Sequence, residues 1–232
     1  MKTIYEQVNL IAHRGLSGEH CENTLPAFVG AGKLPFYGIE TDIQFTKDNK
    51  IVCFHDKSIS RLIGGKQTIS ELTYAELEKM TFKAPYENYQ ICSFKQYLRT
   101  CKKYKKYCII EIKFHVNTKQ LDLLLRIIRW SGYFYKCIII SFNADVLTYL
   151  RGKSRSLRLQ LLIKNPIKRY IEFCKKYNID VSLYERIILK DTVAKINSHG
   201  IKVGVWTVNN TDTAQKLINM GVNYITTDTL LK

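Results

Sequence analysis

The chain has 232 residues and carries 36 Lys and Arg against 20 Asp and Glu, a formal net charge of +16. Hydrophobic residues make up 46% and charged residues 24%, a composition typical of globular proteins that excludes disordered and fibrous classes. The length permits one large domain or two small ones. The positive charge favours an anionic partner, such as nucleic acid, a membrane surface or a phosphate-bearing substrate.

The lack of a recognisable targeting signal and the cysteine usage predict a cytoplasmic protein. Glu6 and Gln7 lie where a signal peptide needs an apolar stretch, and no run of about 18 apolar residues predicts a membrane span. The seven cysteines include no C-x-x-C pair, and several lie in apolar runs. They are therefore predicted to be buried free thiols in a reducing compartment, rather than zinc ligands or disulfides.

Apolar strand-like runs alternate with helix-like segments along the chain. The predicted strands cover residues 10–13, 38–42, 108–113, 137–142, 157–163, 180–184, 202–208 and 223–226. The predicted helices cover residues 24–33, 94–106, 118–130, 144–152, 167–177, 185–199 and 211–220. Continuously apolar strands are typical of parallel sheets covered by helices. This rhythm predicts an α/β fold, a TIM-type (β/α)8 barrel forming one catalytic domain over residues 1–232, with a doubly wound sheet as the alternative.

Residues 43–92 break this rhythm and are predicted to form a small insertion at the barrel rim, after the second strand. Residues 45–55 have the pattern of a β-hairpin that turns at Asp48 and Asn49, residue types that tolerate positive φ. A two-residue turn there would place His55 directly opposite Asp42. A short helix is predicted near residues 74–80.

Charged side chains end three of the predicted strands, where burial makes them costly. They are, in chain order, His13 and Arg14, Glu40 and Asp42, and Glu111 and Lys113. The carboxyl ends of barrel strands form one mouth, so these groups and the hairpin histidine are expected to converge there. Taken singly, each group also has a structural interpretation, such as an ion pair between Glu111 and Lys113.

Together these side chains predict a metal-dependent site for a phosphate ester. Three carboxylates offer the hard oxygen ligands that Mg²⁺ or Ca²⁺ prefers, and no Cys/His pattern indicates zinc. Arg14 and Lys113 can neutralise phosphate oxygens. His13 and His55 supply a general acid and a general base near neutral pH.

Short motifs appear in a fixed order along nearly the whole chain. They span residues 11–15 (IAHRG), 22–24 (ENT), 38–42 (GIETD), 52–56 (VCFHD), 111–113 (EIK), 141–142 (SF), 205–209 (VWTVN) and 226–228 (TTD). This series resembles the glycerophosphodiester phosphodiesterase family. The resemblance implies a TIM barrel with a small insertion, which hydrolyses glycerophosphodiesters to glycerol 3-phosphate and an alcohol with a divalent cation, Mg²⁺ or Ca²⁺.

The resemblance also implies a role for each candidate residue. The matches are metal ligation by Glu40, Asp42 and Glu111, acid–base catalysis by His13 and His55, phosphate contact by Arg14 and Lys113, lining of the glycerol or leaving-group side by Trp206, and orientation of Arg14 or His13 by Glu22. Trp206 has the alternative of an ordinary core aromatic, and Asp56 and Asp228 are interpreted as structural. The resemblance favours attack by the glycerol 2-hydroxyl over attack by water, and it leaves open which histidine is the acid.

Two alternative functions are left open, and the basic charge supports the first, a barrel with a vestigial site that binds nucleic acid or an anionic surface. Residues 99–107 interleave cations with tyrosines, a pattern found in proteins that bind nucleic acid. The preferred interpretation is the solvated face of an outer helix, with no specific nucleic-acid partner and with peripheral attraction to an anionic membrane left open. A phospholipase D-like phosphodiesterase on a related barrel is the other alternative.

Overall fold

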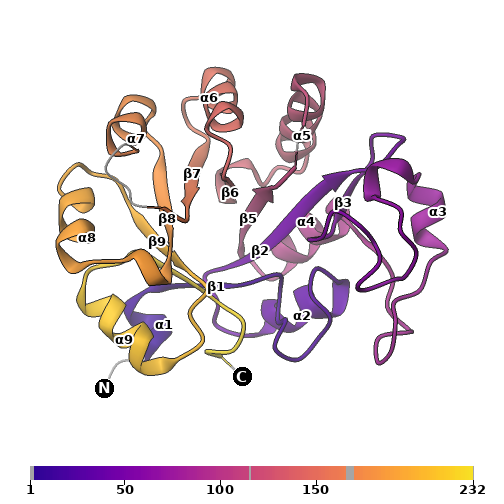
Figure 1. The fold of residues 1–232 in the computed structure, drawn as a ribbon, viewed down its shortest axis with the longest axis horizontal. Helices are drawn as coiled ribbons and strands as arrows, with labels where there is room; N and C mark the ends of the chain where they lie inside the picture. The colour runs from indigo at the N-terminus through magenta and orange to yellow at the C-terminus, as the bar shows by residue number, and fades with distance from the viewer. Residues whose placement is uncertain (1–2, 115, 166–169, 232) are drawn as a thin grey trace.

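Eight parallel strands close into a barrel in the part of the chain that the computed structural model describes, residues 3–114, 116–165 and 170–231 (Figure 1). These strands are β1 (Asn9–Ala12), β2 (Gly38–Phe45), β5 (Tyr107–Ile112), β6 (Cys137–Ser141), β7 (Arg158–Ile163), β8 (Asp180–Tyr184), β9 (Val203–Trp206) and β10 (Tyr224–Thr227). The ring closes because β1 pairs with both β10 and β2. The predicted TIM-type barrel is confirmed, and the doubly wound alternative is wrong.

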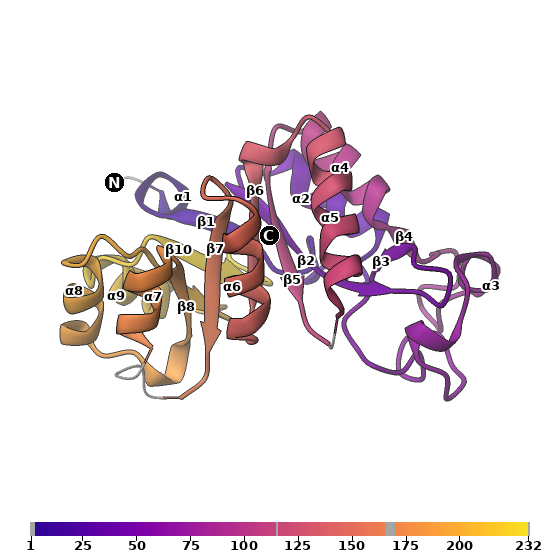
Figure 2. The same ribbon diagram turned by 90° about the horizontal axis from the view of Figure 1, so that it is seen from above.

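Helices cover the outside of this ring (Figure 2). They are α1 (Ile4–Gln7), α2 (Leu25–Lys33), α4 (Phe94–Lys103), α5 (Thr118–Trp130), α6 (Ala144–Lys153), α7 (Ile171–Tyr177), α8 (Lys190–Asn197) and α9 (Thr211–Asn219), with 3-10 turns at η2 (Phe134–Lys136) and η3 (Glu185–Ile187). The helix predicted over 185–199 is divided, because Ile188 is extended and packs with Ile187 against the core. The start of the helix predicted at 167 lies outside the described residues.

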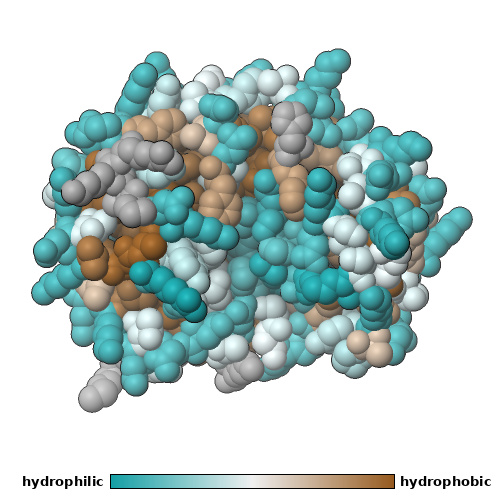
Figure 3. Space-filling view, in the orientation of Figure 1, coloured by the Kyte–Doolittle hydropathy of each residue, from teal (hydrophilic) through white to brown (hydrophobic). Residues whose placement is uncertain are grey.

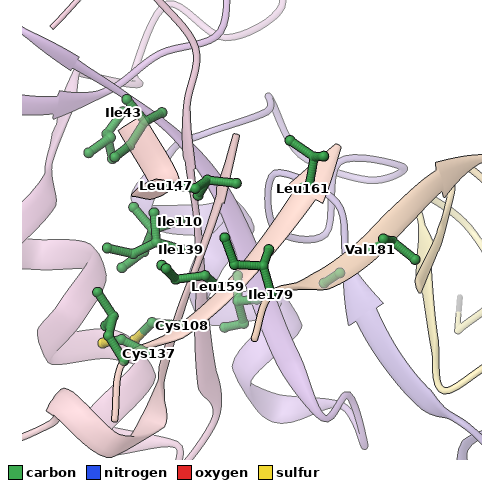
Figure 4. Packing of buried hydrophobic residues seen from close by; sticks show 14 of the residues in the cluster. Ile43, Cys108, Ile110, Cys137, Ile139, Leu147, Leu159, Leu161, Ile179 and Val181 are labelled. Carbon is green, nitrogen blue, oxygen red and sulfur yellow. The ribbon is translucent and has the colours of Figure 1, made fainter. Parts of the chain in front are cut away.

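The strands bury alternate side chains on two sides, as their apolar pattern predicts. Ile110, Ile139 and Leu159 point outward under the helices, where Figure 4 shows them packed near Leu147 of α6. Ile109 and others fill the barrel interior. A Cβ on Gly38 would lie 2.3 Å from Ile109 Cδ1, so the glycine at the start of β2 makes room for this interior packing.

Polar aromatic side chains close the amino-terminal end of the barrel. Arg158, the first residue of β7, donates to the hydroxyls of Tyr37 at 3.1 Å and Tyr224 at 2.7 Å. Tyr37 stacks on Tyr107 with ring centroids 4.2 Å apart, and the Arg158 guanidinium lies 5.1 Å from the Tyr107 ring. One cation therefore links the starts of several strands at the floor of the barrel.

The insertion after β2 contains β3 (Ile51–Cys53), η1 (Ile69–Glu71), α3 (Tyr74–Glu78) and β4 (Cys92–Ser93), and it projects beside the barrel at the right of Figure 1. It has its own apolar cluster, centred on residues such as Phe54, Ile59 and Leu77. This cluster gives the insertion a fixed position from which it presents His55 to the barrel mouth.

The predicted hairpin is present, but its predicted register is wrong by one residue. Ile43 pairs with Cys53, and Phe54 rather than His55 lies opposite Asp42, where its N–H donates to the Asp42 carbonyl at 2.9 Å. The turn has three residues between Thr46 and Lys50, because Asn49 adopts a left-handed φ of 56° that accommodates the extra residue.

Other sequence predictions concern the surface and the thiols. All seven cysteines are free and buried, as predicted. The cations of α4 are exposed on an outer helix, and hydrophilic side chains cover much of the face shown in Figure 3. Among the described residues, no helix is both long and apolar enough to cross a bilayer.

The barrel floor generates a stability prediction. Arg158→Met should lower the free energy of unfolding by about 1 to 3 kcal/mol, because the hydroxyls of buried Tyr224 and half-buried Tyr37 lose a charged donor. Urea denaturation at 25 °C measures this difference. The exposed Arg155→Met is the matched control and should change stability by less than about 0.5 kcal/mol. Equal stability of the two variants would show that the floor contacts contribute nothing.

Candidate functional site

The carboxyl ends of the barrel strands enclose a cavity of about 160 Å³. Seven of the predicted site residues line it: His13, Arg14, Glu40, His55, Glu111, Lys113 and Trp206. Asp42 is buried and within ion-pair distance of Arg14 and Lys113, and Glu22 contacts Arg14 from outside the cavity. The structure therefore brings together all nine residues named from the sequence.

Three acidic side chains form the base of the site. Glu40 and Asp42 share one face of β2, and the parallel register places Asp42 beside Glu111 of β5. One oxygen from each carboxylate lies within 4.8 Å of the others, and the three residues are only 2%, 1% and 8% exposed. Such close burial of three acids is unfavourable unless a cation or protons compensate it.

The hydrogen bonds of this triad leave one oxygen of each carboxylate unbonded. The Arg14 backbone N–H donates to Glu40 Oε2 at 2.8 Å, and Asn23 Nδ2 donates to Asp42 Oδ2 at 2.9 Å. The buried oxygens Glu40 Oε1, Asp42 Oδ1 and Glu111 Oε1 accept no hydrogen bond among the described residues.

These oxygens fit a hard divalent cation. Bonds from Arg14 and Asn23 orient two of the carboxylates, as outer contacts do around metal ligands. Lys113 Nζ lies 3.5 Å from Asp42 Oδ1 and 3.6 Å from Glu111 Oε1, too far for strong hydrogen bonds. The free oxygens are therefore available to one ion.

The charges of the triad are unequal. Burial, together with the neighbouring Asp42 and Glu111 charges, raises the pKa of Glu40 well above its usual range. Burial and the nearby Asp42 raise the pKa of Glu111 to about 7. Burial also acts on Asp42, but Arg14 and Lys113 outweigh it and lower the pKa of that carboxyl. Asp42 therefore ionises most readily of the three, and Glu40 and Glu111 retain protons to higher pH than ordinary carboxyls do.

Each site histidine is oriented by a carboxylate. His13 Nδ1 lies 2.7 Å from Asp228 Oδ1, and His55 Nδ1 lies 2.7 Å from Asp56 Oδ1. A bond at Nδ1 fixes the ring and leaves Nε2 for chemistry in the cavity. Burial lowers the pKa of His55, which favours its neutral form. Burial acts to raise the pKa of Asp228, but the contacts with His13, Asn209 and Ser17 together outweigh it and lower that pKa to about 2.

The sequence interpretation missed what Asp56 and Asp228 contact. It interpreted both as structural, whereas Asp228 contacts His13 and Asp56 contacts His55. The available signal was position: Asp56 directly follows His55, and Asp228 follows the end of β10. An acid at such a position reaches a neighbouring strand end at the barrel mouth.

Arg61 is a third residue whose contacts the sequence interpretation missed. Its Nη2 lies 2.7 Å from Glu22 Oε1, and its Nε lies 2.5 Å from Asp56 Oδ2. Glu22 in turn contacts Arg14 Nη1 at 3.0 Å. Arg61 therefore joins the partner of Arg14 to the partner of His55, although its side chain is 47% exposed.

Aromatic rings form the remaining wall of the cavity. Trp206 Nε1 donates to the Ser182 carbonyl at 3.2 Å, which fixes the indole at the end of β9. The Phe142 ring meets the Trp206 ring edge to face, with centroids 5.6 Å apart, and the tilted Tyr184 ring also contacts it, with centroids 5.3 Å apart. Trp206 lines the cavity as well as packing against the interior cluster.

The comparisons with known proteins agree with this geometry. Residues 13–232 match the family model described as the glycerophosphoryl diester phosphodiesterase family. YhdW of Bacillus subtilis, whose name assigns it provisionally to the glycerophosphodiester phosphodiesterases, is 30% identical over 94% of this chain and 93% of its own length. The glycerophosphodiester phosphodiesterase of Caldanaerobacter subterraneus is 26% identical over 98% and 95%.

Solved structures show the same fold. The phosphodiesterase of Oleispira antarctica, in complex with the product sn-glycerol-3-phosphate, has a TM-score of 0.88 at 21% identity and covers 98% of this chain and 96% of its own. A glycerophosphodiester phosphodiesterase of Thermotoga maritima has a TM-score of 0.80 at 25% identity, over 96% and 95%.

The raised pKa values of the triad predict pH-dependent cation binding. Affinity for Mg²⁺ or Ca²⁺ should increase as pH rises from about 6 to 8, because the Glu111 carboxyl (pKa about 7) must lose its proton to become a ligand. Titration calorimetry in buffers of different ionisation enthalpy measures both affinity and proton release. Glu111→Gln should bind more weakly and release fewer protons, whereas the exposed Asp122→Asn should match the wild type. Affinity independent of pH, without proton release, would contradict this prediction.

Proposed function

The chain belongs to the glycerophosphoryl diester phosphodiesterase family, and from this membership we propose that it hydrolyses glycerophosphodiesters by metal-dependent His/His acid–base catalysis. The products are glycerol 3-phosphate and an alcohol, with residues 1–232 acting as one catalytic domain. The observation that carries the proposal is the set of three free carboxylate oxygens beside two histidines, each held by its own aspartate. Magnesium or calcium would be held by Glu40, Asp42 and Glu111.

The cationic groups of the cavity are suited to a phosphodiester. A bound divalent cation would act as a Lewis acid that polarises the phosphoryl oxygens. Arg14 and Lys113 line the same cavity and can neutralise negative charge that develops on those oxygens. Their ion pairs with Asp42 restrict both side chains before substrate binds. The site thus offers preorganised positive charge.

The two histidines are suited to complementary proton transfers. One Nε2 accepts the proton of the attacking hydroxyl, from the glycerol 2-position or from water, and the other donates a proton to the leaving oxygen as its bond to phosphorus breaks. Attack by water gives glycerol 3-phosphate directly. Attack by the 2-hydroxyl gives a cyclic phosphate, which water then opens at phosphorus while one histidine takes the proton of the water and the other protonates the departing 2-oxygen. The lowered pKa of His55 suits it to the base role. Asp56 and Asp228 stabilise whichever ring carries the positive charge.

The surroundings of the enzyme form a further part of this proposal. Buried free cysteines support a cytoplasmic location, and the exposed cations of α4 support peripheral attraction to anionic membranes. Deacylated phospholipids are the expected substrates.

Release of glycerol 3-phosphate tests the activity. We expect turnover of glycerophosphodiesters that EDTA abolishes and Mg²⁺ or Ca²⁺ restores. His13→Ala and His55→Ala should each lower kcat by about 10² to 10⁴. The exposed His199→Ala is the control and should keep wild-type turnover. Near-normal turnover in either site variant would overturn the catalytic assignment, and no release with any cation would overturn the activity.

Arg61 provides a separate prediction about positioning. Arg61→Met should lower kcat/KM by about tenfold, because a charged bidentate link to Glu22 and Asp56 is lost. It should also shift the acidic limb of the pH profile upward, since Asp56 without its cation raises the pKa of His55. Arg61→Lys should restore part of both effects, and a purely structural role would leave the pH profile unchanged.

A further inference from the structure

Lys164 lies on the aromatic wall of the proposed active site. It directly follows β7, and its Nζ is 5.3 Å from the ring centroid of Phe142 and 5.4 Å from that of Trp206. All three side chains line the cavity that His13 and Arg14 also line. The ammonium therefore occupies the space in front of two ring faces inside the site.

Lys164 differs from the other cations of this cavity in its partners. Arg14 is paired with Glu22 and Asp42, and Lys113 lies beside Asp42 and Glu111. Lys164 contacts two aromatic rings, but no carboxylate of the described residues (3–114, 116–165 and 170–231) lies within ion-pair distance of it. Its positive charge is thus the one in the described cavity lining that no acid balances.

We propose that Lys164 determines specificity by selecting glycerophosphodiesters whose leaving alcohol carries a second anionic group, a phosphate or a carboxylate. This inference rests on the proposed function. The same lysine disfavours quaternary ammonium alcohols such as choline. Aromatic faces are the usual binding surface for such cations, and here Lys164 already covers Phe142 and Trp206 with a positive charge.

The leaving alcohol is the part of the substrate that this charge can match. The scissile phosphate is served by Arg14, Lys113 and the cation held by the acidic triad. The glycerol moiety is neutral and offers Lys164 no anion. A second negative charge on the substrate therefore has to belong to the alcohol that leaves.

The test compares substrates that differ in the charge of the leaving alcohol. Values of kcat/KM are measured at constant ionic strength for glycerophosphocholine, for glycerophosphoglycerol, whose leaving alcohol is uncharged, and for a diester whose leaving glycerol carries a terminal phosphate. In Lys164→Met the ratio of the anionic to the choline substrate should fall about tenfold, and in Lys164→Glu it should fall further. The kcat/KM for glycerophosphoglycerol should change by less than about threefold in both variants.

Lys216→Met and Lys216→Glu are the matched controls, because Lys216 is exposed on the outer helix α9 and changes the net charge by the same amounts. They should leave the substrate ratio unchanged, which separates a local contact from general attraction by the +16 chain. An unchanged ratio in both Lys164 variants would overturn the proposal. An equal loss for all three substrates would also overturn it, since Lys164 would then serve the scissile phosphate.

Binding of the same intact diesters is measured by calorimetry in parallel. If the wild type binds the diesters without cleaving them, the proposed hydrolysis fails, and the ratio of dissociation constants in wild type and Lys164→Glu still decides the specificity proposal. If no diester binds, both proposals fail. A preserved fold in each variant is verified by thermal unfolding, and Lys164→Arg should retain the wild-type preference.

Discussion

Three buried carboxylates at the mouth of the barrel set the main energetic constraint on this molecule, because charges removed from water are costly unless they are compensated. Arg14 carries much of the compensation: its N–H holds Glu40, and its guanidinium lies beside Asp42. It does so from a left-handed backbone conformation, with φ of 55°. Asn23, with φ of 58°, likewise turns its side chain onto Asp42. Unusual backbone is thus found where the acids are held, as is common at functional sites.

The insertion also contributes charged residues next to these buried carboxylates. It folds around its own apolar cluster, and it contributes His55 to the lining of the barrel-mouth cavity. Arg61 ties Asp56 of the insertion to Glu22 of the barrel. His55 therefore reaches the mouth from the insertion and His13 from β1, and the Arg61 ion pairs lie where the insertion meets the barrel.

The sequence predicts the barrel and the acidic triad well, since apolar strand runs and i, i+2 carboxylates are local patterns. The hairpin register was not predictable, because Asn49 in a left-handed conformation lengthens the turn by one residue. The contacts of Asp56, Asp228 and Arg61 were also missed. Charged residues in loops have the same sequence pattern whether they are solvated or paired, and only the closed barrel shows which ones meet.

The charges of the cavity explain how one site can accept both a cation and an anion. Without a divalent ion, the raised pKa values of Glu40 and Glu111 allow protons to balance the triad, so Asp42 faces Arg14 and Lys113 nearly alone. A cation that replaces these protons restores all three acids to the charged state and matches them with its own two charges. The triad and its ion together then carry one net negative charge, the same as the triad with Glu40 and Glu111 protonated, so Arg14 and Lys113 face the same net charge in both states. Under the proposed function, cation binding is therefore coupled to proton release through the same three carboxylates.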